Sequence, residues 1–538
     1  MNRQLPRALL LFVLAVVMSG TASATTYYIA ANGSDSNSGT SNTSPWLHAP
    51  GMNGCSGVCA SVTPVAGDQF ILRGGDTWTS SSLPWNWNWS GSSGNNIFIG
   101  ANQSWFSGSA WTRPVLTGGG AWPGATTGQF FLNIQSNSYL EVANIEFTGY
   151  YQGAAASSQT GYFYKGNGTS VLIHDNYMHG WTHLAGVAEG DPGGNVNALT
   201  CSGNQTDLTT ELYNNVVDGS DTSEDSFGAL YTIGGCNNVY RNYFAWVADA
   251  VNENGIILFH DNVESHTGMM CYSGCGAHNN VMESNNDPVG GMFTYNNLFT
   301  FNAPNDNQGG IVIQLAPKAT YTSYFFNNVV IQGPPYQANE IVCADPLSGS
   351  GSGSTCTIFN NTIEGGVDSG PPSGSIVRAG SFNGQTGPSA INLYNNYIIS
   401  SNSTVITTSD CSNSPCTVTQ TPSTQTRQAL SAANAQGYTS TQTYAFSPTS
   451  ASGVTVGAGV NETSLCATIS SLNAAAGAAC NSDTTYGVTY DSTTHAIVDL
   501  ARTPVARPST GGWDAGAYQF AAGAQPPNPP TGLTATVQ

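Results

Sequence analysis

The chain has 538 residues, of which 11 are Lys or Arg and 31 are Asp or Glu, so its net charge at neutral pH is −20. This charge argues against nucleic acids and anionic membrane surfaces as partners, because both require basic patches on a protein. Only 8% of the residues are charged, 10% are aromatic and Gly is abundant, a composition typical of an all-β extracellular protein with many turns.

The first 24 residues have the pattern of a secretory signal peptide. Arg3 and Arg7 precede the apolar run ALLLFVLAVVM, and the small residues ASA at 22–24 form a cleavage site after about Ala24. No later stretch reaches membrane-spanning length. We therefore expect a secreted, extracellular protein that is monomeric and does not insert into a membrane.

The cysteines are even in number, twelve, as in disulfide-bonded exported proteins. Their spacing predicts six disulfides: Cys55–Cys59, Cys201–Cys236, Cys271–Cys275, Cys343–Cys356, Cys411–Cys416 and Cys466–Cys480.

Tryptophans alternate in the segment LPWNWNWSG, residues 83–91. The alternation places Trp85, Trp87 and Trp89 on one face of a strand. There they could stack on sugar rings as substrate-binding residues, or they could pack as a cap over the first part of the core. Trp246, just past the end of a predicted strand, is a further candidate for substrate binding with the same alternative.

A short motif recurs between residues 140 and 400: an apolar stretch, a ring, two polar residues that are usually Asn-Asn, and a second apolar stretch. The second polar position is always Asn: Asn176, Asn215, Asn242, Asn262, Asn280, Asn297, Asn328, Asn361 and Asn396. LEVANIEFTG, at 140–149, is a degenerate earlier copy. A constant motif with variable spacing is typical of coils of short strands with loops on one side. Stacked Asn side chains can hydrogen-bond from coil to coil, so the repeat predicts a parallel β-helix.

Three further segments carry a resemblance to a known family: TTYYIAANGSDSNSGTSNTSPW (25–46), GDQFILRGGDTW (67–78) and RPSTGGWDAGAYQF (507–520). Together with the repeat, they resemble the first strand with its cap loop, an early coil and the closing strand of the secreted right-handed parallel β-helix, or pectate-lyase-like, proteins. The resemblance implies an all-β, single-stranded right-handed parallel β-helix with an N-terminal cap over residues 25–400. An irregular C-terminal wrap would follow at 401–522, and a Pro-rich flexible tail at 523–538. This fold hosts lyases, hydrolases, epimerases, tailspikes and adhesins, so it does not assign the chemistry.

Acidic residues gather in three consecutive predicted coils between residues 218 and 266. Hydrolysis of a glycosidic bond needs two carboxyl groups, and neighbouring coils lie about 4.8 Å apart, which allows both retaining and inverting separations. Elimination from a uronate needs a base instead, usually Lys or Arg in lyases of this fold, and a cation on the substrate carboxylate. The candidate catalytic residues are Asp225, Asp249, Glu253, Arg241, Glu264 and His266.

Arg241 stands where most copies of the motif have Asn, and its alternative role is to pair with Asp261 in the next coil. Ca²⁺ is the one cofactor that the acidic cluster suggests, with Asp218, Asp221 and Glu224 as its ligands. The alternative is an acidic turn in solvent, or a Ca²⁺ ion that only stabilises.

The segment GIILFHDNVESHTG (255–268) contains H-D-x-x-E-x-H. The repeat explains His260 as a ring, Asn262 as a ladder residue and Asp261 as a partner for Arg241. Glu264 and His266 remain, since Glu264 falls in a column of mostly apolar residues. We therefore predict a polysaccharide lyase or glycoside hydrolase that acts on an extracellular polysaccharide in a groove around residues 218–266. The alternative is a non-catalytic, adhesin-like surface or matrix protein that binds glycans.

Overall fold

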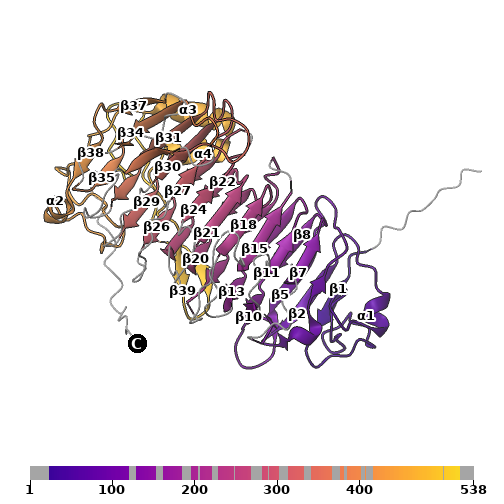
Figure 1. The fold of residues 1–538 in the computed structure, drawn as a ribbon. Helices are drawn as coiled ribbons and strands as arrows, with labels where there is room; N and C mark the ends of the chain where they lie inside the picture. The colour runs from indigo at the N-terminus through magenta and orange to yellow at the C-terminus, as the bar shows by residue number, and fades with distance from the viewer. Residues whose placement is uncertain are drawn as a thin grey trace, which may run out of the picture.

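The computed structural model describes residues 23–119, 129–152, 161–183, 196–203, 206–220, 228–247, 249–267, 281–288, 290–301, 313–332, 341–365, 376–380, 384–401, 406–407, 416–500 and 502–521. In this part of the chain three long sheets run side by side, and all their strands are parallel (Figure 1). Each full coil supplies one strand to each sheet in turn. The molecule is a right-handed parallel β-helix, as predicted.

The three sheets are named here A, B and C. Sheet A consists of β1 (Thr26–Ile29), β2 (Gln69–Gly74), β5 (Ile97–Phe106), β8 (Leu140–Ala143), β12 (Val171–His174), β16 (Glu211–Tyr213), β19 (Asn238–Tyr240), β22 (Leu258–His260), β25 (Phe293–Tyr295), β28 (Thr322–Phe326), β31 (Thr355–Phe359), β34 (Ala390–Tyr394) and β37 (Thr417–Thr421). Sheet B consists of β4 (Trp85–Asn86), β7 (Gln129–Gln135), β11 (Gly161–Gly166), β15 (Val196–Ser202), β18 (Gly228–Ile233), β21 (Asp249–Asn254), β24 (Met282–Ser284), β27 (Ile313–Leu315), β30 (Ile341–Ala344), β33 (Val377–Gly380) and β36 (Ile406–Thr407).

Sheet C consists of β3 (Thr77–Trp78), β6 (Val115–Thr117), β9 (Glu146–Thr148), β13 (Tyr177–His179), β17 (Val216–Asp218), β20 (Tyr243–Val247), β23 (Val263–Thr267), β26 (Leu298–Phe301), β29 (Val329–Gln332), β32 (Thr362–Glu364), β35 (Tyr397–Ile399) and β38 (Thr426–Gln428). A short parallel pair, β10 (Tyr150–Gln152) and β14 (Trp181–His183), and an antiparallel hairpin, β39 (Thr489–Asp491) and β40 (Ala496–Val498), lie outside the three sheets. The described helices are α1 (Gly57–Ser61), the 3₁₀ turn Ser80–Ser82, α2 (Leu430–Ala435), α3 (Thr463–Leu472) and α4 (Ala474–Cys480).

Each coil passes from sheet A to sheet C through a two-residue bend. The first bend residue has a positive φ, for example 54° at Asn214 and 56° at Asp261, a conformation that Asn and Asp tolerate better than most side chains. The second is the ladder Asn. Asn215, fully buried, donates from its backbone N–H and its Nδ2 to Oδ1 of Asn242, both at 3.0 Å. The predicted ladder therefore exists, and Gln425 takes the place of Asn at its last rung.

One predicted rung was wrong. Asn262 bonds directly to Oδ1 of Asn297, so the copy at 277–284 adds no rung between them; Asn280 itself lies outside the described residues. The apolar end of this copy forms β24, which pairs with β21 and β27 in sheet B. The interval from Asn262 to Asn297 holds one full coil, whose three strands are β23, β24 and β25.

The ring before each bend also forms a column, on the outer face of sheet A. Consecutive rings from His174 through Tyr213 and Tyr240 to His260 and Tyr295 are stacked nearly parallel, with centroids 4.6–5.1 Å apart. Phe326 and Phe359 continue this ring ladder under α3 and α4. The aromatic column seen in the sequence is thus a continuous stack.

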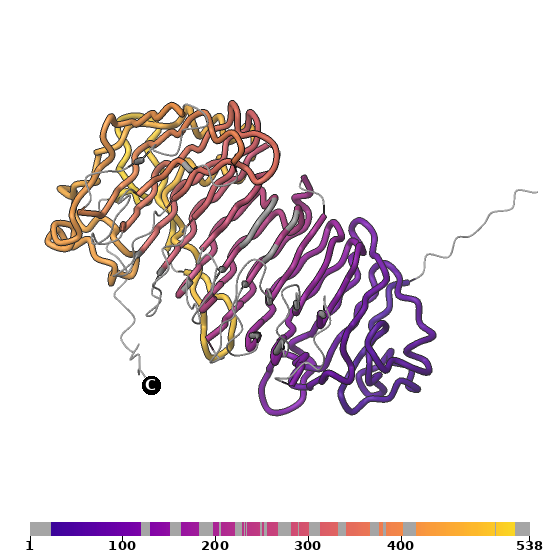
Figure 2. Tube along the Cα trace, in the orientation of Figure 1, coloured from indigo at the N-terminus to yellow at the C-terminus, as the bar shows by residue number. Residues whose placement is uncertain are grey.

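The β-helix continues past its predicted end at residue 400, because β37 and β38 add a strand each to sheets A and C. The chain then runs back over the outside of the coils (Figure 2). Residues around α2, Tyr486 and Tyr518 pack on the outer apolar residues of sheet C, and α3 and α4 pack on those of sheet A. This C-terminal cover is the predicted wrap, although 507–520 forms no named strand there. The cover also hydrogen-bonds to the bends, for example from Gly516 N–H to the Asn395 carbonyl at 2.6 Å.

Three of the predicted disulfides are present: Cys55–Cys59, Cys201–Cys236 and Cys466–Cys480. Cys416 is also disulfide-bonded, while Cys411, Cys271 and Cys275 lie outside the described residues. Cys343 and Cys356 are buried free thiols, so the bond predicted between them is wrong. Burial, followed by contact with Cys343, raises the pKa of Cys356 and so disfavours the thiolate that disulfide formation requires.

Within the described residues, no helix is long and apolar enough to cross a membrane.

Candidate functional site

The outer face of sheet C carries a row of side chains that sequence reasoning had only partly singled out. In its strands the central residue, such as Met178 or Val217, points into the core and is fully buried, so the residues on either side of it point outward. The outward residue that follows the central one lies near the loop into sheet B, and the register aligns these residues from coil to coil. They are called here the outer polar row: Thr148, His179, Asp218, Ala245, Ser265 and Thr300. Neighbours in this row are about 4.8 Å apart.

Trp246 and His266 form the edge of this row on the side of the loops into sheet B. They follow Ala245 and Ser265 in consecutive coils, and both have positive φ, 57° and 52°. Their rings are stacked with centroids 4.2 Å apart and an angle of 8° between them. Ser265 Oγ lies 2.7 Å from His266 Nδ1. The two predicted site residues are therefore brought together, half-buried, beside Asp218.

The opposite edge is built by the β39–β40 hairpin. His495 stacks on Tyr177 at 4.0 Å, and Tyr490 stacks on Tyr243 at 4.7 Å. Tyr490 Oη lies 2.6 Å from His495 Nδ1, which ties the two strands of the hairpin together. Tyr177 also stacks on His179 at 4.2 Å, so the hairpin continues the aromatic surface that flanks the outer polar row. In Figure 1 the hairpin lies beside β20 and β13.

Two carboxylates flank His179. Glu146 Oε1 is 3.1 Å from His179 Nε2, and Asp218 is the neighbour of His179 in the next coil. The coils that carry Glu146 and Asp218 are two apart, hence about 9.6 Å. Asp218 is nearly buried and accepts a hydrogen bond from Ser220 N–H at 2.9 Å.

The imidazoles at both edges favour the neutral form. Burial lowers the pKa of His266, and the negative charge of Asp218 only partly offsets it. Burial is also the main cause that lowers the pKa of His495, and the positive charge of His179 lowers it further. The negative charges of Glu146 and Asp218 act in the opposite direction and only partly offset this. Near neutral pH these two rings are therefore proton acceptors. Burial, followed by the charge of Asp218, raises the pKa of Tyr490, which keeps its phenol protonated.

Two arginines border this region, and each is engaged by the chain itself. Arg113 donates from Nε to the Asp175 carbonyl and from Nη1 to the Thr494 carbonyl, both at 2.9 Å. Arg241 Nη1 lies 2.5 Å from Asp499 Oδ1, and its Nε donates to Asn214 Oδ1 at 2.9 Å.

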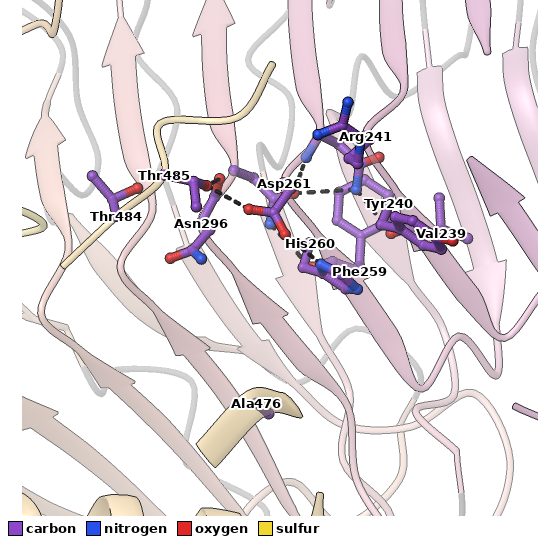
Figure 3. A network of polar contacts seen from close by, with 12 residues as sticks. Val239, Tyr240, Arg241, Phe259, His260, Asp261, Asn296, Ala476, Thr484 and Thr485 are labelled. Carbon is purple, nitrogen blue, oxygen red and sulfur yellow. Dashed lines mark hydrogen bonds and ion pairs between the residues drawn. The ribbon is translucent and has the colours of Figure 1, made fainter. Parts of the chain in front are cut away.

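The predicted pairing of Arg241 with Asp261 is wrong. The Asp261 carboxylate instead lies 2.5 Å from His260 Nδ1 and accepts the Thr485 hydroxyl of the C-terminal cover (Figure 3). The reason is the left-handed bend at both residues, which turns each side chain toward the cover that crosses it.

Glu264 was a catalytic candidate, but it lies in the inward column of sheet C between Phe244 and Phe299 and is fully buried. It belongs to the core and does not face the outer polar row. Asp249 is the first and Glu253 the next-to-last residue of β21, in register with Gly228 and with Thr232. Asp221, Glu224 and Asp225 lie outside the described residues. Among the residues that the structure does describe, no three His, Cys, Asp or Glu are grouped as metal ligands.

The predicted sugar-binding role of Trp85 and Trp87 is wrong, because both are fully buried in the main core. Their indole N–H groups donate to the carbonyls of Pro50 and Trp89, at 2.9 and 2.6 Å. The predicted alternation is correct, but it points the indoles inward. Trp89 is partly buried against the same core.

Sequence reasoning missed Glu146, His179, Tyr490 and His495. The first two lie in copies of the repeat, at 140–149 and 172–180, and a column-by-column search for outward polar residues would have found them. The hairpin residues give no such signal, because Arg113 and Thr494 are 381 positions apart in the sequence.

No family model matches the chain, and no curated protein matches it. Among solved structures, it is similar to a GH136 lacto-N-biosidase from Eubacterium ramulus, with TM-score 0.43 and 12% identity over 75% of this chain and 67% of that one. It is also similar to the PL6 family polysaccharide lyase Pedsa3628 from Pseudopedobacter saltans, with TM-score 0.39 and 13% identity over 68% of this chain and 89% of that one. It is similar as well to the pectate lyase Pel9A, with TM-score 0.34 and 14% identity over 74% of this chain and 82% of that one.

The chain has a parallel β-helix fold. At these identities, the similarity concerns the path of the chain and not its functional residues.

Proposed function

We propose that this protein is a secreted carbohydrate-active enzyme, a glycoside hydrolase that cleaves a neutral extracellular glycan along the outer polar row of sheet C. The observation that carries the proposal is the pair of carboxylates, Glu146 and Asp218, on either side of His179. Aromatic rings border them on both sides. Trp246 and the hairpin ring His495 offer the apolar surfaces on which sugar rings pack.

The charge distribution favours a neutral substrate. The protein has a net charge of −20, and both arginines beside the row are bonded to the chain itself. A uronate polymer would meet repulsion there. Elimination also depends on a proton made acidic by a neighbouring uronate carboxyl, so a neutral glycan leaves hydrolysis as the reaction.

The separation of the carboxylates favours inversion. Inverting glycosidases hold their two carboxyl groups about 6.5–9.5 Å apart, so that a water molecule fits beside the sugar. Two coil spacings give about 9.6 Å between the two strands. Glu146 stands in the Tyr177 column and its side chain reaches over to His179, the neighbour of Asp218, an arrangement nearer to the inverting range than to the about 5 Å of a retaining pair. One carboxyl group would protonate the leaving oxygen while the other takes a proton from water. The hydrogen bond from His179 would orient Glu146.

The test is cleavage of a panel of neutral polysaccharides by the exported protein, followed by reducing ends and by the anomeric NMR signal of the first product. We expect inversion, and a fall in kcat of about 10²–10⁴-fold in Glu146→Gln and Asp218→Asn. Glu211→Gln is the matched control, since Glu211 is an outward carboxylate of sheet A, bonded to Tyr240 Oη at 2.8 Å. Binding without cleavage, unchanged by either substitution, would instead indicate a non-catalytic glycan-binding protein.

A second candidate is a polysaccharide lyase, favoured by the lowered pKa of His266 and the protonated phenol of Tyr490. A neutral imidazole can take the proton beside a uronate carboxyl, and a phenol can protonate the leaving oxygen. Ca²⁺ would then be needed to neutralise the substrate. Unsaturated products from polygalacturonate or alginate, lost in His266→Gln and on chelation, would support elimination over hydrolysis.

A further inference from the structure

A second surface of the molecule has the features of a ligand site. It is a depression of about 890 Å³ on the outer face of sheet A, over β2, β5 and β8. Binding sites for small molecules have volumes of about 300–1,000 Å³. The depression lies on a different sheet from the outer polar row.

The depression exists because the ring ladder stops. Register places Ile71, Gly100 and Ala143 in the column that His174 continues. From His174 to Tyr394 the coils of sheet A carry a ring at this position, whereas Gly100 and Ala143 carry none. Gly100 is required there, since a Cβ would lie 2.0 Å from the Ala143 carbonyl oxygen.

Phe98 lines the depression. A Cβ on Gly100 would come within 3.0 Å of Phe98 Cζ, so the ring extends along its strand and over the glycine. The ladder rings, stacked on one another, expose mainly their edges. Phe98 is half-buried and, among the described residues, has no ring stacked on it, so it is the aromatic surface in the lining of the depression. The negative face of an aromatic ring attracts the C–H bonds of a sugar.

The remaining lining is rich in carboxamides. Asn95, Asn96, Gln103 and Asn144 take part in no side-chain hydrogen bond with the described residues, and each amide offers donors and acceptors. Glu141 is the one charged residue of the lining, and its Oε1 lies 3.2 Å from His174 Nε2. An aromatic face surrounded by uncharged amides suits an uncharged ligand with many hydroxyl groups.

From these features we infer that the depression is a second glycan-binding site, specific for a segment of neutral oligosaccharide and separate from the outer polar row. It holds a polysaccharide chain on sheet A while sheet C acts on another part of it. Its existence does not depend on the hydrolase proposal, because a non-catalytic protein could use it equally.

The test is affinity electrophoresis in gels that contain soluble xylan, mixed-linkage β-glucan or galactomannan, with polygalacturonate as the acidic counterpart. The parent is the double variant Glu146→Gln, Asp218→Asn, so that cleavage does not obscure binding. We expect at least one neutral polymer to retard it, and Phe98→Ala to weaken this binding by at least about tenfold, the factor that corresponds to 1.4 kcal/mol. Tyr321→Ala, which removes a half-buried ring elsewhere, is the matched control and keeps the binding.

Because Phe98→Ala could disturb the sheet, the pair Asn96→Ala, Gln103→Ala gives an independent measurement, with the urea midpoint of each variant checked first. Three results would overturn the inference. They are no retardation by any neutral polymer, retardation by polygalacturonate alone, and retardation that neither the Phe98 nor the amide variants change. The last result would place binding elsewhere on the molecule.

Discussion

At the residue scale, the two positions of each bend have separate tasks. The first accepts a positive φ, and the second carries the buried amide that joins neighbouring coils. This division explains why the first position varies among Asn, Asp and Arg while the second is always Asn from Asn176 to Asn396. The second is bonded from coil to coil, whereas buried first-position residues such as Asn327 and Asn395 bond to the C-terminal cover.

Asn262→Ala should therefore destabilise the protein strongly. Asn262 Oδ1 accepts the N–H and the Nδ2 of Asn242, and its own Nδ2 donates to Val239 and Asn297. Each buried group left without a partner costs about 1–3 kcal/mol, so we expect a loss of about 3–5 kcal/mol in urea unfolding. The control Asn88→Ala, at an exposed position, should change little. A loss below about 1 kcal/mol for Asn262→Ala would contradict this account of the ladder.

Arg241 is the one basic residue in a bend position, and it has a φ of 57°. Its ion pair with Asp499 is largely exposed, and such pairs contribute about 0–1 kcal/mol. Asn, which most other coils use, adopts this φ with less strain. Arg241→Asn should therefore leave the unfolding free energy unchanged or raise it by up to about 1 kcal/mol, and should preserve cleavage. A large loss of activity at unchanged stability would restore Arg241 as a catalytic residue.

His174 should give the protein a defined pH dependence. Burial lowers its pKa, but hydrogen bonds to Asp175 and Glu141 outweigh that effect and raise it to about 9, above the usual 6.5. The folded state thus binds this proton more tightly than the unfolded state. The resulting stabilisation, at most about 3 kcal/mol, is complete below about pH 6.5 and lost as the pH rises through about 9.

The measurement is the difference in urea unfolding free energy between the native protein and His174→Gln, from pH 6 to pH 10. It should be largest at pH 6 and shrink above pH 8. A difference that stays constant across this range would mean that the folded protein does not hold His174 in the charged form.

At the element scale, the coils could be predicted because each repeats the same local chemistry. The copy at 277–284 shows the limit of that reasoning. Apolar residues after an Asn pair describe a strand of sheet B as well as one of sheet C, and only coil length separates them. The hairpin could not be predicted as part of a site, because residues far apart in the sequence create its contacts with Tyr177 and Tyr243.

Replacing Tyr490 and His495 together by Ala should release this hairpin. Stacking on Tyr243 and Tyr177 would be lost, and aromatic pairs contribute about 0.5–1.5 kcal/mol each beyond their buried area. We expect faster hydrogen exchange at 489–498 with little change in the urea midpoint of the β-helix. Thr493→Ala, at the exposed turn of the hairpin, is the matched control. If exchange at 489–498 were unchanged, the hairpin would be held by Arg113 rather than by the rings.

At the scale of the whole molecule, the β-helix and its cover have different origins. The coils follow from a repeated motif and were predicted almost throughout. The cover depends on apolar packing and on hydrogen bonds to particular bends, which no repeat announces. The segment 507–520 resembled a closing strand but forms no named one. Arg507 is the centre of those contacts. Its Nη2 donates to Asn327 Oδ1 at 3.0 Å and to the Gly516 carbonyl at 3.1 Å, and its guanidinium lies 5.3 Å from the Trp513 ring centroid.

Arg507→Met should therefore detach the cover while the coils persist. Burial lowers the pKa of Arg507 to about 10, yet it stays charged at neutral pH. Its removal leaves Asn327 Oδ1 and the Gly516 carbonyl without this donor, and each buried group left unbonded costs about 1–3 kcal/mol. Hydrogen exchange should accelerate at Gly516, which bonds to the bend at Asn395, but not at the inner ladder. Arg427→Met, at an exposed arginine of β38, is the control. Equal acceleration in cover and ladder would mean that the two unfold as one cooperative unit.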